Sequence, residues 1–269
     1  MDEGRRRRAL AGVMLAVFLA AMESTVVATA MPTVVASLGG LEIYAWVFSG
    51  FLLTSTVTMP VWGRLSDLFG RRPTFLAGLG VFLAGSALAG AAADMPQLIA
   101  FRMLQGIGAG SLMTIGMTIV GELFGLERRA RMQGYISGVW GVASLCGPLI
   151  GGLLTDHVSW RWVFYVNVPF GAAAIALLAG ALRDEATPAR PRALDYRGFA
   201  LFAAGVSALM VGVLEAGRAS AWTGMGVVGP LAVSAVALPA FVVAERRAAE
   251  PLVPLRLFRH RIVLAAVAT

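Results

Sequence analysis

The stretch GRLSDLFGRRPTF, residues 63–75, is a short polar turn between two long apolar runs. Glycine permits backbones to approach closely, and opposite charges close together can pair. The glycines and central charged residues of the turn are Gly63, Gly70, Asp67, Arg71 and Arg72. The turn predicts a link between two membrane-spanning segments. Its plainest interpretation is a basic cytoplasmic loop with one compensating acid.

The composition on both sides of this turn is that of a membrane protein. Hydrophobic residues make up 58% of the 269 residues, charged residues only 14%, and the mean hydropathy is +0.78. Apolar runs of about 20 residues, the length that crosses a bilayer as a helix, predict an all-α integral membrane protein. The runs lie at 10–31, 44–62, 74–93, 97–121, 132–155, 162–182, 198–217 and 223–244, and a ninth begins at 262.

The basic residues predict the orientation of these spans. If the amino terminus is cytoplasmic, 19 of the 22 arginines fall in cytoplasmic segments and only Arg161 and Arg218 fall outside. This asymmetry follows the positive-inside rule and places the protein in the cell membrane. The net charge of +7 is therefore a topology signal, and no nucleic-acid partner is expected. The first apolar run is too long for a secretory signal and is followed by further spans.

The residue inventory does not favour an enzyme or a cofactor site. The single cysteine, Cys146, lies in an apolar run, and the two histidines, His157 and His260, are far apart. No metal or cofactor is therefore predicted. There is no lysine to reach a nucleotide phosphate, which argues against ATP-driven transport.

The stretch RMLQGIGAG, which begins at Arg102, contains glycines that could suggest a nucleotide loop. A dinucleotide motif must follow a strand, whereas these glycines lie inside one apolar span. Gly106 and Gly110 are four residues apart and share one helical face. The interpretation is close helix packing.

Two opposite charges lie inside spans at similar depth. By the helical rise, Glu23 is roughly 10 Å, and Arg102 about 8 Å, from the outer face. Intramembrane charges are usually paired or functional. The hypothesis is that both face one cavity, where Arg102 keeps Glu23 ionised until the helices separate and Glu23 takes a proton. A static ion pair, or an Arg102 that reaches outward to the interface, is the alternative.

The fifth run carries the stretch GVASLCGPLIGG. Pro148 removes a backbone donor, so a kink or flexible point is expected, and neighbouring glycines leave room for another helix. A packing kink without transport meaning is the alternative. Trp140, deep in the same run, could line a cavity, although lipid contact or helix packing is the favoured interpretation.

Five ordered motifs resemble the major facilitator superfamily, and specifically its fourteen-span drug:proton antiporters. Residues 63–75 resemble the loop signature, RMLQGIG the fourth-span motif, GVASLCGPLIGG the antiporter motif, MESTVVATAMPTV the first-span motif and WRWVFYVNVPFG the sixth-span region. Glu23 replaces the usual aspartate of the first-span motif, and Ala143 replaces one glycine of the antiporter motif.

The resemblance implies three groups of site residues. The proton- and substrate-coupling group is Glu23, Arg102 and Gln105. The cytoplasmic gating group is Gly63, Asp67, Gly70, Arg71, Arg72 and Glu122. The antiporter-motif hinge is Gly134, Gly147, Pro148, Gly151 and Gly152.

The expected organisation is a six-span bundle at 1–182, a linker at 183–197, two additional spans at 198–244, a linker at 245–261 and the start of a second bundle at 262–269. The resemblance implies proton-coupled efflux of hydrophobic or cationic small molecules such as drugs, with antibiotic resistance as a consequence. The expected partners are the bilayer, protons, substrate and the second bundle. Because alternating access needs both bundles, we expect this chain alone to be inactive, as a truncated or split-gene product. Export of an endogenous metabolite, or a structural or regulatory role without transport, is the alternative.

Overall fold

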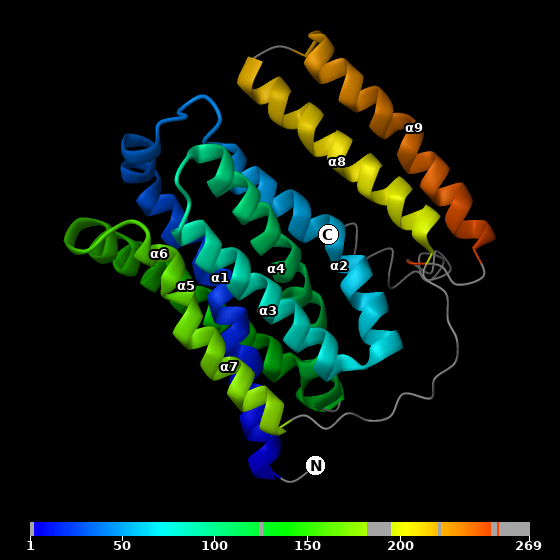
Figure 1. Ribbon diagram of the computed structural model, residues 1–269. Helices are drawn as coiled ribbons and strands as arrows, with labels where there is room; N and C mark the ends of the chain where they lie inside the picture. Colours follow the sequence, from blue (N-terminus) through cyan, green and yellow to red (C-terminus); the bar gives the residue numbers. More distant parts are fainter. Residues whose placement is uncertain (1–2, 124–125, 182–194, 220–221, 249–251, 253–269) are drawn as a thin grey trace. The chain divides into compact units, whose positions relative to one another are not determined.

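The computed structural model describes residues 3–123, 126–181, 195–219, 222–248 and 252, and the chain divides into two compact units, 1–188 and 189–269. The described residues form helices joined by short turns (Figure 1). The helices of the first unit are α1 (Glu3–Leu38), α2 (Trp46–Phe69), α3 (Arg71–Gly90), α4 (Met95–Leu123), α5 (Leu126–His157), α6 (Trp162–Tyr165) and α7 (Asn167–Ala181). An all-α membrane fold is therefore confirmed, since a helix satisfies its own backbone polar groups in lipid.

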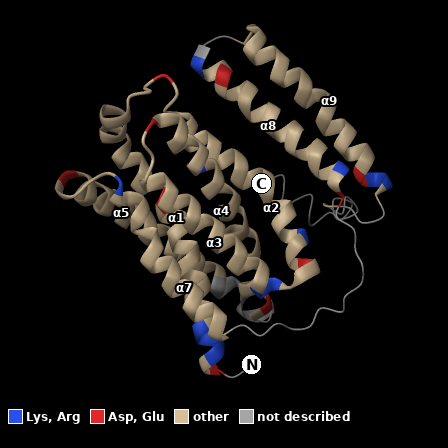
Figure 2. Ribbon diagram, in the orientation of Figure 1, with Lys and Arg blue, Asp and Glu red and all other residues tan. Residues whose placement is uncertain are grey.

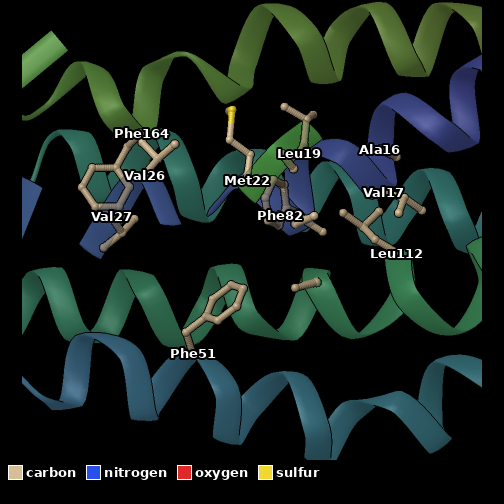
Figure 3. Close-up of a cluster of buried hydrophobic side chains, with 14 of the residues drawn as sticks. Ala16, Val17, Leu19, Met22, Val26, Val27, Phe51, Phe82, Leu112 and Phe164 are labelled. Atoms are coloured by element: carbon tan, nitrogen blue, oxygen red, sulfur yellow. The ribbon is translucent and has the colours of Figure 1, made fainter. Parts of the chain in front are cut away.

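Helix α1 occupies the middle of the first unit and contacts α4, α5, α6 and α7, while α4 packs against both α2 and α3. The apolar side chains of α1 form the centre of the core together with aromatic side chains from three other helices (Figure 3). The core residues labelled in that view are Ala16, Val17, Leu19, Met22, Val26, Val27, Phe51, Phe82, Leu112 and Phe164. This packing fixes the depth at which the polar side chains of α1 lie.

Helix α2 differs from the prediction. Seven helical segments of the described chain, with α6 and α7 counted together, are long and apolar enough to cross a membrane, and α2 is not among them. Hydroxyl residues at 54–58 lower its hydropathy. Thr54 and Thr58 donate to the carbonyls of Met103 and Ile107 at 2.8 and 3.2 Å, so α2 packs along α4 through hydrogen bonds.

The sixth span, predicted as one helix over 162–182, is divided. Helix α6 ends at Tyr165, and α7 begins at Asn167 after Val166. Pro169, in the first turn of α7, has no backbone N–H to donate to the carbonyl of Tyr165. The break therefore follows from the proline, and it makes Asn167 the first residue of α7.

Many of the charged residues of the first unit lie at or near helix ends (Figure 2). The arginines at the start of α1 and those of the α2–α3 turn lie at one end of the bundle. Two of them bond to the carboxyl end of α7: Arg5 Nη2 to the carbonyl of Ala181 at 3.3 Å, and Arg72 Nη2 to that of Ala179 at 2.8 Å. Cations at a helix carboxyl terminus are stabilising because they meet unpaired carbonyls.

The second unit contains α8 (Tyr196–Ala219) and α9 (Met225–Arg247), which pack against each other along their lengths. Gly205 lies against Leu238 and Gly212 against Leu231, and the rings of Phe202 and Phe241 are 5.4 Å apart. Helix α8 begins at Tyr196 and helix α9 ends at Arg247. The last residues of the predicted linker 183–197 and the first residues of the predicted linker 245–261 are therefore helical. The rest of those linkers, apart from residues 195, 248 and 252, and the ninth run at 262–269 lie outside the described residues.

Candidate functional site

Glu23 on α1 and Arg102 on α4 form an ion pair in the interior of the first unit. Arg102 Nη1 lies 2.5 Å from Glu23 Oε1, and each side chain is only 1% exposed. The two residues that sequence depth placed at the same level are therefore in contact. Both side chains are buried in this structure.

Arg102 has further partners on α2, α4 and α6 that hold its guanidinium in place. Its Nε donates to the carbonyl of Val47 at 3.3 Å, and its Nη1 donates to Gln105 Oε1 at 2.7 Å. The guanidinium carbon lies 4.2 Å from the ring centroid of Phe51 and 6.0 Å from that of Phe164. Cation–π contact compensates part of the lost hydration of a buried guanidinium.

The second oxygen of Glu23 is bound by a residue to which the sequence analysis gave no role. Asn167 Nδ2 donates to Glu23 Oε2 at 2.6 Å and to Ser86 Oγ at 2.9 Å, and Ser86 Oγ donates to the carbonyl of Phe164 at 2.8 Å. Asn167 and Ser86 are fully buried. An asparagine and a serine inside apolar spans were the available signal, because buried amides and hydroxyls require partners.

Small residues bring the four helices close enough for this polar cluster. Gly85 on α3 lies against the backbone of Gln105, where an added Cβ would be 2.5 Å from the amide nitrogen. Gly106 and Gly110 both face α2, against the carbonyls of Phe51 and Ser55. The predicted helix-packing role of these two glycines is therefore confirmed, and a phosphate-binding loop is not formed.

Arg71 is the centre of a second, more exposed ionic cluster at the α2–α3 turn. It pairs with Asp67 and donates from Nε to Glu122 Oε1 at 3.1 Å and from Nη1 to Ser66 Oγ at 2.9 Å. The side chains of Asp67 and Glu122 are 48% and 54% exposed. The cluster links α2, α3 and α4 at their ends.

The other members of the gating group have structural contacts. Gly70 separates α2 from α3 with φ = 95°, a backbone conformation that favours glycine. An added Cβ at Gly63 would lie 3.5 Å from Thr114 Cγ2, an ordinary contact. Arg72 Nη2 donates to the carbonyl of Ala179 near the carboxyl end of α7.

The glycines of the antiporter-motif group divide into two sets. Gly147 and Gly151 face α1, against the hydroxyls of Thr25 and Thr29 respectively, whereas Gly134 and Gly152 border open space. Helix α5 runs through Pro148 without interruption. Ala143, the small-for-small replacement, is fully buried, and its carbonyl accepts from Thr25 Oγ1 at 3.5 Å. Trp140 is 40% exposed on α5.

The fold and these clusters define the class of protein: an α-helical membrane protein with a charged pair buried inside its first helical unit. The family model of the Major Facilitator Superfamily matches residues 13–268, and the chain belongs to this superfamily.

Among curated proteins, the chain is 38% identical over 259 residues to "Multidrug transporter protein MdtP" of Bacillus subtilis (strain 168), covering 96% of this chain and 48% of that protein. It is 37% identical over 253 residues to "Acurin A biosynthesis cluster MFS-type transporter" of Aspergillus aculeatus, covering 92% of this chain and 46% of that protein. The chain thus spans about half the length of these relatives. Among solved structures, the human organic anion transporter MFSD10 (TETRAN) shares the fold, with a TM-score of 0.60 and 20% identity over 80% of this chain and 57% of that one.

Proposed function

We propose that this chain supplies the proton-coupling half of a secondary active transporter that expels hydrophobic or cationic small molecules from the cytoplasm. The main observation behind this proposal is the buried ion pair of Glu23 and Arg102, a titratable carboxyl group and its counter-charge inside a helical membrane bundle. The relative MdtP is named a multidrug transporter, which supports the substrate class. Glu23, Arg102 and Gln105 form the coupling group in this proposal.

Coupling follows from the cost of an unpaired buried charge. While Arg102 is in contact, Glu23 stays ionised because the guanidinium stabilises its negative charge. When α1 and α4 separate, an isolated carboxylate in a dry interior is unfavourable, and protonation neutralises it. Proton uptake and helix movement are therefore tied to each other, as antiport requires.

The remaining groups take part in the same cycle. The ionic cluster of Arg71, Asp67 and Glu122 is a cytoplasmic gate, since ion pairs at helix ends hold one arrangement and break in another. Gly147 and Gly151, which face α1, form with Pro148 the seam along which α5 and α1 move. The amino terminus is cytoplasmic, and substrate access is completed by a second bundle, because alternating access requires two bundles that rock about a central site.

Export of an endogenous metabolite is the second candidate. The relative from Aspergillus aculeatus, 37% identical, is named for a biosynthesis cluster rather than for drug resistance. The buried polar cluster serves either cargo, because it couples the proton and leaves substrate choice to other surfaces.

The test is transport in proteoliposomes with an imposed proton gradient. One sample holds the 269-residue chain alone, and the other holds the chain fused to the unmatched carboxyl half of MdtP. We expect the fusion to move a fluorescent hydrophobic cation against its gradient and Glu23→Gln to abolish proton-driven movement. Glu3→Gln is the matched control, since Glu3 is exposed at the start of the same helix and pairs with Arg7 one turn further along.

Proton-driven transport that persists in Glu23→Gln would disprove the coupling role. Transport by the chain alone would show that the second bundle is dispensable. A fusion that folds and binds neither drug-like cations nor metabolites would favour the structural or regulatory alternative.

A further inference from the structure

Asn167 is a buried amide whose donor group is fully hydrogen-bonded and whose acceptor oxygen is not. Both hydrogens of Nδ2 are directed to oxygens: Glu23 Oε2 at 2.6 Å and Ser86 Oγ at 2.9 Å. Its Oδ1 is buried and has no hydrogen-bond partner. A buried polar atom without a partner is unfavourable and rare, so it calls for an explanation.

The hydrogen bonds that the Glu23 side chain requires change when it is protonated. An ionised carboxylate is an acceptor only, and it is satisfied by donors from Arg102 and Asn167. A neutral carboxyl carries an O–H that must find an acceptor in the interior. In the present arrangement Asn167 presents a donor to Glu23 Oε2, which would oppose that O–H.

Among the other side chains that act on Glu23, no acceptor atom is without a hydrogen bond. Among the described residues, the charged group that acts on Glu23 is Arg102 on α4, and the neutral side chains that act on it are Asn167 on α7 and Gln105 on α4. Arg102 has donors alone, and Gln105 Oε1 already accepts from Arg102 Nη1. On α5, which also packs against α1, Ala143, Gly147 and Gly151 meet α1 and carry no titratable side chain. The unused acceptor beside Glu23 Oε2 is Asn167 Oδ1.

We propose that Asn167 is a positioning residue that binds Glu23 in both of its protonation states by a half-turn of its amide. With Glu23 ionised, Nδ2 donates to Oε2, as in this structure. A hydronium ion then transfers a proton to Oε2 and leaves as water: one O–H bond breaks in the hydronium ion, one forms on the carboxyl group, and the amide turns so that Oδ1 accepts the new O–H. The inference rests on the proposed proton coupling at Glu23.

Ser86 on α3 assists the turn because a hydroxyl both donates and accepts. It now accepts from Asn167 Nδ2 and donates to the carbonyl of Phe164. After the turn, its hydrogen swings from that carbonyl to Asn167 Oδ1, which has two lone pairs for Glu23 and Ser86 together. Three helices, α1, α3 and α7, thereby respond to one proton.

Infrared difference spectroscopy of the 269-residue chain in lipid nanodiscs, between acidic and alkaline pH, tests this assignment without transport. The carboxyl C=O band of Glu23 is identified by its loss in Glu23→Gln. Asn167→Leu keeps the number and branching of the side-chain heavy atoms and removes both donor and acceptor. We expect the Glu23 band to move to higher wavenumber in Asn167→Leu, because the protonated carboxyl has lost its acceptor.

The matched control is Ser111→Ala, which removes another fully buried hydroxyl, on α4 and outside this network, and should leave the band in place. If Asn167→Leu does not fold, Ser86→Ala replaces it as the test. This variant keeps the Asn167 amide and removes the hydroxyl that bonds to it, so a smaller shift of the Glu23 band in the same direction is expected. A band at the wild-type position in Asn167→Leu or, in its place, in Ser86→Ala overturns the inference, as does the absence of any Glu23 band in the wild type. A shifted band in a protein whose fusion shows no efflux supports the inference and counts against the proposed function alone.

Discussion

Arg71 donates from Nε to Glu122 Oε1 at 3.1 Å and so joins the first residue of α3 to the last turn of α4. Because the Glu122 side chain is 54% exposed, solvent screens this pair, and Glu122→Gln should lower the free energy of unfolding by less than about 1 kcal/mol. Arg71→Ala should cost more, since Arg71 also contacts Asp67 and Ser66. Thermal unfolding in detergent, at low and high salt, measures both.

Salt supplies the internal control for this cluster. The loss in Glu122→Gln should shrink further in high salt, because exposed charges are screened over about 10 Å at 0.1 M. The part of the Arg71→Ala loss that comes from the neutral Ser66 contact should persist. A Glu122→Gln variant that is as unstable as Arg71→Ala would contradict this account.

Gly151 and Gly152 are neighbours in α5 with opposite surroundings. An added Cβ at Gly151 would lie 2.9 Å from the carbonyl of Val26 on α1 and would also meet Thr29, whereas an added Cβ at Gly152 meets nothing within 4 Å. Gly151→Ala should therefore lower stability by about 1–3 kcal/mol through overpacking. Gly152→Ala should be near neutral. Unfolding of the two variants in parallel measures the difference.

The adjacent glycine makes this comparison independent of helix propensity, because both substitutions have the same intrinsic effect on α5. Equal stability of the two variants would mean that α1 and α5 do not pack through Gly151. A loss confined to Gly151→Ala would locate the seam between the helices.

The sequence predicted the spans and the charge pair from one-dimensional information. Run length predicts a helix in lipid, and equal depth along two spans predicted that Glu23 and Arg102 share a level. Their contact could be anticipated because the interior of a bundle offers a buried charge few other partners. The resemblance to the superfamily brought in Glu122, which the structure places beside Arg71.

The polar network around Glu23 could not be predicted in the same way. Ser86 and Asn167 are 81 residues apart, and their contact depends on how α3 and α7 cross, which periodicity does not give. The division of the sixth span depends on Pro169, whose missing donor acts within a run that looks continuous by hydropathy. In helix α2 the hydropathy misleads in the opposite direction. Its hydroxyl residues lower the hydropathy of the segment, but two of these hydroxyls donate to carbonyls of α4.

A double-mutant cycle distinguishes two free energies: the destabilisation caused by leaving one buried charge unpaired, and the interaction free energy of the Glu23–Arg102 pair. Arg102→Gln leaves an ionised or newly protonated Glu23 without its main partner, and breaking such a pair costs about 3–5 kcal/mol. Glu23→Gln likewise leaves a buried guanidinium with Val47, Gln105 and Phe51. The double variant has no charge at this site, so its loss of stability should be clearly smaller than the sum of the two single losses.

Chemical unfolding of the four proteins in the same detergent measures the cycle, and Arg102→Lys extends it. Lysine keeps the positive charge but offers one nitrogen, which cannot reach Glu23 and the Val47 carbonyl together as the Nη1 and Nε atoms of Arg102 do. Its stability should therefore fall between the wild type and Arg102→Gln. If the losses of stability in the two single variants add up to that of the double variant, the two side chains do not interact. If Arg102→Lys is as stable as the wild type, the positive charge alone accounts for the stabilisation at this site.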